Sequence, residues 1–520
     1  MKKPVILAIL DGWGISDIQR GNAISEANLP TIEKLNQFYP CIALQTSGIS
    51  VGLPWGEPGN SEVGHMTLGT GKVIYQNLPR ITMSIQNGEF YENPTFLSTV
   101  KHVKENNSAL HLIGLVGKGG VHSTLDHLYA FLEFAAKQNL DKVFLHVFTD
   151  GRDSAPTSGI ESIRELQNKM EKFGVGKIAT IGGRYFGMDR NNNWDRIQKS
   201  YDTMTRGQGE KIENPADYLT KSYAKDIFDE YIEPGVMIEN GKPVATIESG
   251  DAVIFLNYRE DRARQLTKAF VLPDFSEFPT KKIDNLKFVT MVQYEEGLPC
   301  EVAFEPIKIK NCLGRILSNH KLTQLRIAET EKFAHVTYFF NGGGEEPFPG
   351  EDRVIIPSKD VPSFDQAPEM SANEITEKLT RFIEEEKYDF ILVNYANADI
   401  VGHTGNEKAA ILAVETIDKC LDKLIKAVLQ KDGCLMITAD HGNAEEMINS
   451  RTGEADTEHS SNPVPLYFIT KDNHRQKENS SKEVCRVSGL LSDIAPTILD
   501  LFSLKKDPDM TGESLLSILK

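Results

Sequence analysis

Residues 390–443 read FILVNYANADIVGHTGNEKAAILAVETIDKCLDKLIKAVLQKDGCLMITADHGN. A short apolar run at 390–393 leads into the turn NYANAD, and a second run at 434–439 leads into DHGN. Between them, residues 408–429 carry apolar side chains at three- and four-residue spacing, with charged side chains on the opposite face. That spacing is typical of an amphipathic helix. Strand, helix and strand in this order predict a parallel strand pair joined by a crossover helix.

The same pattern of apolar run, glycine-containing turn and helical segment recurs along the chain. The further runs and the turns that follow them are 5–10 with DGWG, 110–116 with GKGGVHS, 143–149 with DGRD, and 252–256 with NYREDR. Continuous apolar runs of this length are typical of parallel strands that are buried on both faces. The sequence therefore predicts an α/β protein with mostly parallel sheets covered by helices.

The polar turns after these strands fall into two groups along the chain. Turns rich in Asp and His occur near both ends, at about 11, 399 and 440, whereas turns rich in Arg occur in the middle, at about 152, 184 and 259. In open α/β sheets, ligands bind beyond the carboxyl ends of the strands. We therefore predict one domain made of residues 1–75 and 308–520, with a second α/β domain, residues 76–307, inserted into it.

The composition indicates a globular protein and disfavours several other classes of protein. The 520 residues include 57 basic and 74 acidic side chains, which gives a net charge of −17, and 40% are hydrophobic. These values are typical of globular proteins, and the negative charge disfavours binding to nucleic acid or anionic membranes. No apolar stretch approaches the ~18 residues of a membrane span, and no small-residue cleavage site follows the first apolar run. Six scattered cysteines without a CxxC pair disfavour a disulfide scaffold, so we expect a cytoplasmic protein.

Six residues in the turns near the chain ends could bind a metal. Asp399 and His403 are four positions apart, so a helical turn would point both in one direction. Asp440 and His441 are adjacent, and joint use requires a backbone turn, which Gly442 would permit. The other two candidates are Asp11 and His459. Three imidazoles with three carboxylates suit Mn²⁺ or Zn²⁺ better than Ca²⁺ or Mg²⁺. A single Asp–His pair is more often a turn cap or a surface pair.

Ser61, in PGNSEVGH, precedes a predicted helix and allows two interpretations. It could be an ordinary N-cap, with Glu62 in the first helical turn. It could also be a nucleophile at a helix N-terminus, where backbone N–H groups can bind a phosphoryl group. A serine hydroxyl needs activation, which direct coordination to a metal would supply.

The middle third of the chain contains a candidate anion site. Guanidinium groups are shaped to bind carboxylate and phosphate in a bidentate manner, although isolated arginines are more often solvated surface residues. The candidates are His122, Arg152, Asp153, Arg184, Arg190, Arg259 and Arg262, together with Lys332 after the predicted insertion.

Motifs in a fixed order resemble those of cofactor-independent phosphoglycerate mutases, a family of the alkaline phosphatase superfamily. They are PGNSEVGH, DGRD, GRYFGMDR, NYREDR, ETEKFAHVTYFFNGG, PEMSA, NADIVGHTG, TADHGN and HSSNPVP. The resemblance extends from residue 11 to residue 465. It implies interconversion of 3-phosphoglycerate and 2-phosphoglycerate, in glycolysis and gluconeogenesis, through a phosphoserine and without bisphosphoglycerate. It also implies an alkaline-phosphatase-like doubly wound domain that carries the insertion.

The resemblance assigns a role to each candidate residue. It implies one metal on Asp399, His403 and His459, and a second on Asp11, Ser61, Asp440 and His441, with Mn²⁺ expected. Ser61 would be the nucleophile and Asp153 the acid or base for the glycerate hydroxyls. The substrate would bind to His122, Arg152, Asp153, Arg184, Arg190, Arg259, Arg262 and Lys332. We expect a monomer whose only partner is the small-molecule substrate.

Three residues depart from the family pattern. Lys118, Thr124 and Glu458 stand where aspartate, histidine and a small residue are more usual, but none of them is an expected metal ligand.

A metal-dependent phosphomonoesterase or another phosphomutase is the nearest alternative function. A sulfatase is disfavoured because no Cys/Ser-x-Pro-x-Arg motif is present. A non-catalytic phosphate-binding protein would be expected to have lost ligands.

Overall fold

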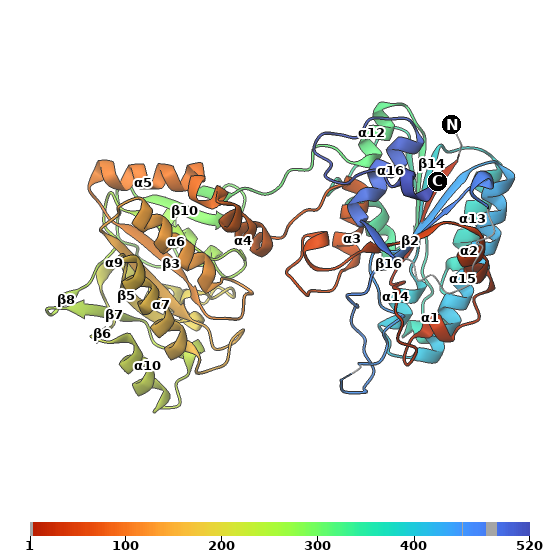
Figure 1. Ribbon diagram of the computed structural model, residues 1–520. Coiled ribbons are helices and arrows are strands. Elements are labelled where there is room, and N and C mark those ends of the chain that lie inside the picture. Colours follow the sequence, from red (N-terminus) through yellow and green to blue (C-terminus); the bar gives the residue numbers. More distant parts are fainter. Residues whose placement is uncertain (1–3, 450, 475–485) are drawn as a thin grey trace. The chain divides into compact units, whose positions relative to one another are not determined.

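The computed structural model describes residues 4–449, 451–474 and 486–520. Two compact units make up the chain. Unit 1 combines Met1–Gln76 with Lys308–Lys520, and unit 2 is Asn77–Ile307. In Figure 1, the red and the blue ends of the chain lie together in unit 1, whereas the orange to green segments form unit 2.

Unit 1 contains an eight-stranded mixed sheet in the order β13-β12-β14-β1-β15-β16-β2-β17. The neighbours β12, β14, β1 and β15 run parallel, and β16 is antiparallel to both β15 and β2. The strands are β1 (Val5–Leu10), β2 (Cys41–Gln45), β12 (Gln324–Glu329), β13 (Glu351–Ile356), β14 (Phe390–Tyr395), β15 (Cys434–Thr438), β16 (Val464–Ile469) and β17 (Val487–Leu490).

Burial explains the continuous apolar runs of the central strands. All six residues of β1 and of β14 are buried, so neither strand needs polar side chains on alternate positions. The helices of unit 1 are α1 (Ala23–Glu26), α2 (Pro30–Phe38), α3 (Ser61–Thr70), α12 (Leu313–Asn319), α13 (Ala372–Glu384), α14 (Asn397–Gly402), α15 (Glu407–Gln430), α16 (Ile494–Leu501) and α17 (Leu516–Leu519). The predicted crossover helix is α15, which connects α14 to β15 and buries its apolar face.

Unit 2 is built around a second sheet, in the order β11-β10-β9-β3-β4-β5-β7-β6, with β8 paired to β7. The strands are β3 (Leu110–Val116), β4 (Val143–Thr149), β5 (Lys177–Gly183), β6 (Glu210–Ile212), β7 (Gly235–Glu239), β8 (Lys242–Pro243), β9 (Ala252–Phe255), β10 (Lys287–Val292) and β11 (Glu301–Phe304). The helices are α4 (Asn77–Asn87), α5 (Pro94–Asn106), α6 (Leu125–Lys137), α7 (Gly159–Phe173), α8 (Arg184–Gly187), α9 (Trp194–Arg206), α10 (Pro215–Tyr223) and α11 (Arg264–Val271).

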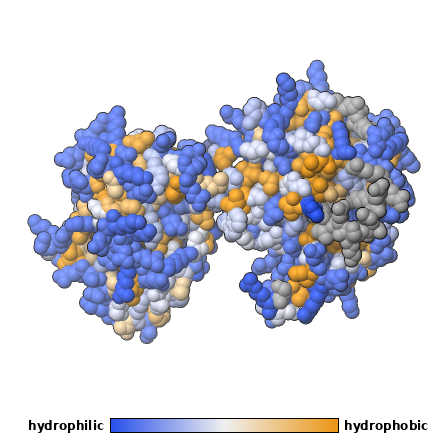
Figure 2. Space-filling view, in the orientation of Figure 1, coloured by the Kyte–Doolittle hydropathy of each residue, from blue (hydrophilic) through white to orange (hydrophobic). Residues whose placement is uncertain are grey.

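Each unit has its own hydrophobic core, one around β1, β14 and β15 and the other around β3, β4 and β9. Hydrophilic residues cover most of the visible surface of both units (Figure 2). The predicted fold class, two α/β domains with one inserted into the other, is confirmed by this arrangement.

Two further sequence expectations concern membranes and cysteines. Within the described ranges, the structure contains no helix that is both long enough and apolar enough to cross a bilayer. Cys300, Cys312 and Cys420 are free cysteines, whereas Cys41 is disulfide-bonded. In the described part of the chain, the disulfide at Cys41 is not a scaffold of disulfides. The hydrophobic cores of the two units account for the fold.

Candidate functional site

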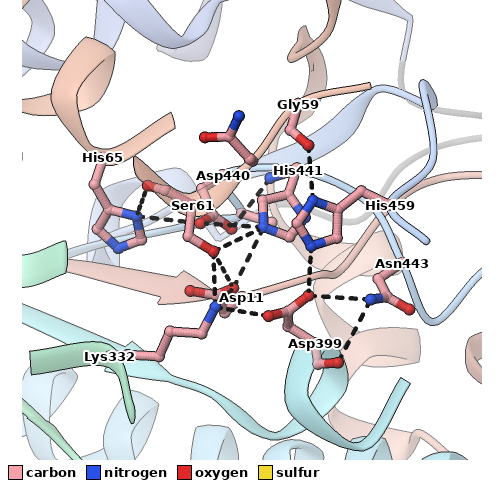
Figure 3. Close-up of polar contacts among 12 residues, drawn as sticks. Asp11, Gly59, Ser61, His65, Lys332, Asp399, Asp440, His441, Asn443 and His459 are labelled. Atoms are coloured by element: carbon pink, nitrogen blue, oxygen red, sulfur yellow. Dashed lines mark hydrogen bonds and ion pairs between the residues drawn. The ribbon is translucent and has the colours of Figure 1, made fainter. Parts of the chain in front are cut away.

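The carboxyl ends of four parallel strands in unit 1 meet at one edge of the sheet. Asp11 follows β1, Asp440 follows β15, and Asp399 lies in the first turn of α14, directly after β14. Lys332 follows β12 in the short helical turn Thr330–Lys332. Because the strands are adjacent and parallel, these side chains come together although they are far apart in sequence (Figure 3).

One group consists of Asp399, His403 and His459. The helical turn expected from the spacing of Asp399 and His403 is α14, and His403 Nε2 lies 3.2 Å from Asp399 Oδ1. His459 Nε2 lies 3.2 Å from the same oxygen and 3.0 Å from His403 Nε2. The Nδ1 atoms of the two histidines face the backbone carbonyls of Thr457 and Gly59. Three ligand-type atoms therefore converge on one point.

A second group surrounds the hydroxyl of Ser61. Ser61 Oγ donates to Asp11 Oδ1 at 3.1 Å and lies 2.9 Å from His441 Nε2. His441 Nε2 is 3.5 Å from Asp11 Oδ1 and 3.6 Å from Asp440 Oδ2. Asp11, Asp440 and His441 are completely buried, and Ser61 is 6% exposed. Asp11, His441 and Asp399 of the first group also have ligand atoms within 4.8 Å of one another.

The chain bends at Asp440 and His441, as joint use of their side chains requires, and Gly442 follows this bend. The backbone at Gly442 does not adopt the left-handed conformation that would require glycine. A Cβ atom there would instead meet Glu445 Oε1 and Ser460 Oγ at 2.2 and 2.3 Å. The glycine is needed because these two side chains pack against it, on the segment that carries His441.

Ser61 is the first residue of α3, and Asn60 is the N-cap. The Asn60 side chain accepts a hydrogen bond from Val63 N at 2.9 Å, so the interpretation of Ser61 as an N-cap is wrong. Gly64, on the next turn, allows α3 to approach the strand ends closely, because a Cβ atom there would lie 2.8 Å from the Asp440 Cβ. The hydroxyl of Ser61 is thus free to face the carboxylates.

Lys332 lies inside this cluster. Its Nζ donates to Asp11 Oδ1 at 2.6 Å, to Asp399 Oδ2 at 2.6 Å and to Ser61 Oγ at 2.7 Å. Burial alone would lower the pKa of Lys332, but the neighbouring carboxylates of Asp11 and Asp399 raise it well above its usual value. The ammonium therefore remains charged and compensates part of the negative charge of the site.

The carboxylates have opposite electrostatic environments. Burial, together with the charge of Asp440, raises the pKa of Asp11. Burial acts in the same direction on Asp399, but the Lys332 ammonium and the hydrogen bonds from the two neighbouring histidines hold its pKa well below the usual range. Asp399 also raises the pKa of His403 through their hydrogen bond. The buried carboxylates of the site therefore favour the binding of cations.

The residues present fit two divalent cations. Asp440 Oδ2 is completely buried, and its nearest partners are two imidazoles, His65 Nδ1 at 3.1 Å and His441 Nε2 at 3.6 Å, so a cation beside it would compensate the carboxylate charge. The set of carboxylate, imidazole and hydroxyl donors suits Mn²⁺ or Zn²⁺, and no thiolate takes part in it. Three groups of acidic and histidine side chains have ligand atoms within 4.8 Å of one another: Asp399, His403 and His459; Asp11, Asp399 and His441; and Asp11, His65 and Asp440.

Three buried residues of this site were missed by the analysis of the sequence. Asn443 Nδ2 donates to Asp399 Oδ1 at 3.0 Å, and Asn394 Nδ2 donates to Asp11 Oδ2 at 2.7 Å. The third residue is His65, which contacts Ser61 and Asp440. His65 closes the motif PGNSEVGH, and the two asparagines lie in the turns NYANAD and TADHGN, so their motif positions were a usable signal.

In unit 2, the buried guanidinium of Arg184 forms an ion pair with the partly buried carboxylate of Asp153. Arg184 Nη1 donates to Asp153 Oδ2 and Asp150 Oδ1, both at 2.5 Å, and Arg184 is 2% exposed. Asp150 also accepts hydrogen bonds from the backbone N–H groups of Arg152 and Asp153, so it shapes the turn DGRD. Asp150 is a further residue that the sequence reasoning missed.

Asp261 gathers three more of the predicted residues around one carboxylate. Arg190 Nη1 donates to Asp261 Oδ2 at 2.8 Å, Arg259 Nε lies 3.4 Å from Oδ1, and His122 Nδ1 lies 3.6 Å from Oδ1. Burial and the charge of Arg184 lower the pKa of His122 to about 4, so its imidazole is neutral at pH 7. Asp261 belongs to the motif NYREDR, but only the arginines of that motif were predicted as site residues.

Arg152 and Arg262 have looser contacts. Arg152 is about half exposed and lies 3.6 Å from Glu230, whereas Arg262 donates to the carbonyl of Met188 at 3.1 Å. Burial and the nearby Arg184 lower the pKa of Arg262. Cations of like charge held close together are the arrangement expected of an anion site. All the predicted arginines belong to unit 2, whereas Lys332 does not.

The three departures from the family pattern have ordinary local contacts. Lys118 Nζ lies 3.0 Å from both Glu161 and Glu165 on an exposed surface. Thr124 is the N-cap of α6 and makes no side-chain capping bond. Glu458, next to His459, donates its backbone N–H to Asp456.

Comparisons with known proteins cover both units. Residues 81–296 match the family model described as BPG-independent PGAM N-terminus, and residues 325–488 match that of type I phosphodiesterase / nucleotide pyrophosphatase. The chain is 50% identical over 517 residues to a 2,3-bisphosphoglycerate-independent phosphoglycerate mutase of Clostridium perfringens, with 99% of each chain covered. It is 48% identical over 516 residues to the protein of that name from Acetivibrio thermocellus, again with 99% of each covered.

A solved structure is also similar. The Leishmania mexicana phosphoglycerate mutase, crystallised at low cobalt concentration, is 29% identical and superposes with a TM-score of 0.52. The match covers 99% of this chain and 97% of that one. Similarity therefore extends over both units and is not confined to a single motif.

Proposed function

The chain belongs to the 2,3-bisphosphoglycerate-independent phosphoglycerate mutases, and from this premise we propose that it interconverts 3-phosphoglycerate and 2-phosphoglycerate through a phosphoserine at Ser61. The observation that carries the proposal is the position of the Ser61 hydroxyl, which lies within 3.1 Å of Asp11, His441 and Lys332. A serine hydroxyl becomes an effective nucleophile when such neighbours favour loss of its proton.

Two divalent ions, most suitably Mn²⁺, would bind to this site. Asp399, His403 and His459 would hold one ion, and Asp11, Ser61, Asp440 and His441 would hold the other. When bound, these ions would neutralise phosphate oxygens and favour the ionised form of the Ser61 hydroxyl. The completely buried carboxylate of Asp440 supports this assignment, since a cation beside it would compensate its negative charge.

The chain's own residues transfer the phosphoryl group. The ionised Ser61 Oγ forms a bond to phosphorus while the bond between phosphorus and the glycerate ester oxygen breaks, and that oxygen takes up a proton from Asp153. Lys332 Nζ, which donates to Ser61 Oγ at 2.7 Å, directs positive charge at the phosphoryl oxygens. In the second half of the reaction, the other glycerate hydroxyl attacks phosphorus and the Ser61 oxygen leaves.

We assign binding of the glycerate to the charged residues of unit 2. Arg152, Arg184, Arg190, Arg259 and Arg262, with His122, would bind the carboxylate and the phosphate. Asp153 would give a proton to one glycerate oxygen and accept a proton from the other, which keeps the exchange balanced. Its contact with Arg184 Nη1 at 2.5 Å holds the Asp153 carboxylate in one orientation and so supports this role.

The assay that tests this function uses the full chain with Mn²⁺ and 3-phosphoglycerate, in the strict absence of 2,3-bisphosphoglycerate. We expect 2-phosphoglycerate to form and inorganic phosphate to be a minor product. Release of phosphate as the main product would instead indicate the alternative, a phosphomonoesterase. Strict dependence on added bisphosphoglycerate would contradict the proposal.

Two coarser properties follow from the same proposal. The reaction is a step of glycolysis and gluconeogenesis, for which a cytoplasmic location is the natural one. A single chain supplies every residue named above, so catalysis requires no second copy and we propose a monomer. Light scattering of the purified protein would test the monomer directly.

A further inference from the structure

A buried chain of polar side chains joins Asp11 to Asp440 through two residues that the proposed function does not use. Asn394 Nδ2 donates to Asp11 Oδ2 at 2.7 Å and lies 3.1 Å from His65 Nε2. His65 Nδ1 lies 2.9 Å from the carbonyl oxygen of Ser61 and 3.1 Å from Asp440 Oδ2. His65 and Asn394 are both 0% exposed, and Figure 3 shows His65 beside Ser61 and Asp440.

The chemistry of the partners determines where the imidazole proton lies. A carboxylate only accepts hydrogen bonds, so the group of Asn394 that faces Asp11 is the amide NH₂ and not the oxygen. The same NH₂ group faces His65 Nε2, which must therefore accept. The proton of a neutral His65 is then on Nδ1, which faces two acceptors, Ser61 O and Asp440 Oδ2.

We infer that His65, held in this tautomer by Asn394, is a positioning residue that orients the Asp440 carboxylate and the first turn of α3 for metal binding. The inference rests on the proposed function, in which Asp440 and Ser61 are ligands of the same ion. One N–H group on Nδ1 lies against both ligand residues, so movement of the ring would displace both. Groups that orient metal ligands in this way commonly affect metal affinity by about 10–100-fold.

The position of His65 on α3 strengthens the argument. His65 is four residues after Ser61, so its ring folds back along the helix onto the Ser61 carbonyl. Gly64 places α3 against the Asp440 backbone, because a Cβ atom there would lie 2.9 Å from the Asp440 carbonyl oxygen. The helix and the end of β15 are therefore in direct contact where His65 acts.

The test measures Mn²⁺ binding to the full chain by calorimetry after chelation. His65→Phe keeps a ring of similar shape but removes both ring nitrogens. We expect it to raise the Kd of one of the two Mn²⁺ sites by about 10–100-fold and to leave the site of Asp399, His403 and His459 near its wild-type Kd. The visible spectrum of bound Co²⁺ should change for the weakened site only.

Two further variants separate positioning from a general structural effect. His65→Asn places an amide nitrogen where Nδ1 lies, so it should restore Mn²⁺ affinity to within about threefold of the wild type if that donor is what matters. His127→Phe makes the same imidazole-to-phenyl exchange in the core of unit 2 and should leave both Kd values unchanged. The unfolding temperature of each variant in chelator reports whether it is folded.

The results distinguish the inference from the proposed function. If a folded His65→Phe protein binds Mn²⁺ at both sites with the Kd of the wild type, the inference about His65 is wrong, but the proposed function is not affected. Equal weakening of both sites, or failure of His65→Asn to recover affinity, would also overturn it, since only a structural role would then be left. A wild-type protein that binds no Mn²⁺ would contradict the proposed function itself, and the inference with it.

Discussion

Ser61 is the residue on which the proposed chemistry depends. Its hydroxyl is not needed to cap α3, because Asn60 provides the capping bond. We therefore expect Ser61→Ala to fold with nearly the stability of the wild type and to retain the metal site of Asp399, His403 and His459. Turnover should fall to background because the nucleophile is lost. Activity assays and Mn²⁺ titration would check this, and an active Ser61→Ala protein would exclude Ser61 as the nucleophile.

Lys332 is expected to matter for stability as well as for catalysis. It is 4% exposed and pairs with Asp11 and Asp399 at 2.6 Å. Removing one partner of a buried ion pair leaves charge without compensation and commonly costs about 3–5 kcal/mol. Lys332→Met should therefore lower the free energy of unfolding in chelator by a few kcal/mol. Added Mn²⁺ should recover part of this loss, because the ion supplies positive charge to the same carboxylates.

Urea denaturation with chelator and with Mn²⁺ measures this effect. Arg381→Met, which removes an exposed cation paired with Glu385 on the surface, is a suitable control and should change stability little. If Lys332→Met has the same free energy of unfolding as the wild type in chelator, the Lys332 ammonium does not stabilise the fold by compensating Asp11 and Asp399.

At the scale of elements, the pairing of α4 with α6 should make unit 2 sensitive to acid. His127 on α6 is 1% exposed, and its Nε2 lies 2.9 Å from Thr82 Oγ1 on α4. Burial lowers the pKa of His127 to about 4, below its usual value of 6.5. The unfolded chain therefore binds a proton that the folded chain excludes. The stability contribution is complete above pH 6.5 and is lost as the pH falls from 6.5 towards 4.

From this residue we expect a loss of about 2 kcal/mol between pH 7 and pH 5, since one pKa unit corresponds to about 1.4 kcal/mol. His127→Phe should remove that part of the pH dependence. Hydrogen exchange of peptides from α4 and α6 at the two pH values would measure it. An identical slope in variant and wild type would show that other groups account for the acid sensitivity.

At the scale of the whole molecule, activity should depend jointly on metal and pH. Imidazole binds metal only when it is neutral, and the hydrogen bond to Asp399 raises the pKa of His403. Protons therefore begin to compete with the metal for His403 at a pH above the usual pKa of histidine, and this competition grows as the pH falls. We expect activity to fall on mild acidification, with a midpoint that moves to lower pH as free Mn²⁺ is increased. Initial rates measured over a range of pH at several Mn²⁺ concentrations test this. If the midpoint of the pH–activity curve does not change with Mn²⁺ concentration, another titrating group limits the activity.

The strands of this molecule were predictable because each central strand is a continuous buried apolar run. The predicted run at 5–10 coincides with β1, and the run at 110–116 coincides with β3. Strand order was not predictable in the same way, since an apolar run does not specify its neighbours. Lys332 shows the consequence, because only the placement of β12 beside β14 brings its ammonium to Asp399.

The candidate site was partly predictable for a related reason. Polar residues after strand ends are visible in the sequence, whereas the partners that hold them are not. Asn394 and Asp261 both stand in motifs that the sequence displays, but only the fold shows that Asn394 contacts Asp11 and that Asp261 contacts Arg190. The roles of all these residues in catalysis stay predictions.

The most direct test of the account is to identify the phosphorylated residue during turnover. The full chain with Mn²⁺ is mixed with 3-phosphoglycerate in the absence of bisphosphoglycerate, quenched in acid within the first turnovers, and digested for mass spectrometry. We predict a single phosphoryl group on the peptide that contains Ser61, formed at least as fast as product and absent from Ser61→Ala. Rapid product formation with no phosphate on Ser61, or with phosphate on another residue, would contradict the account.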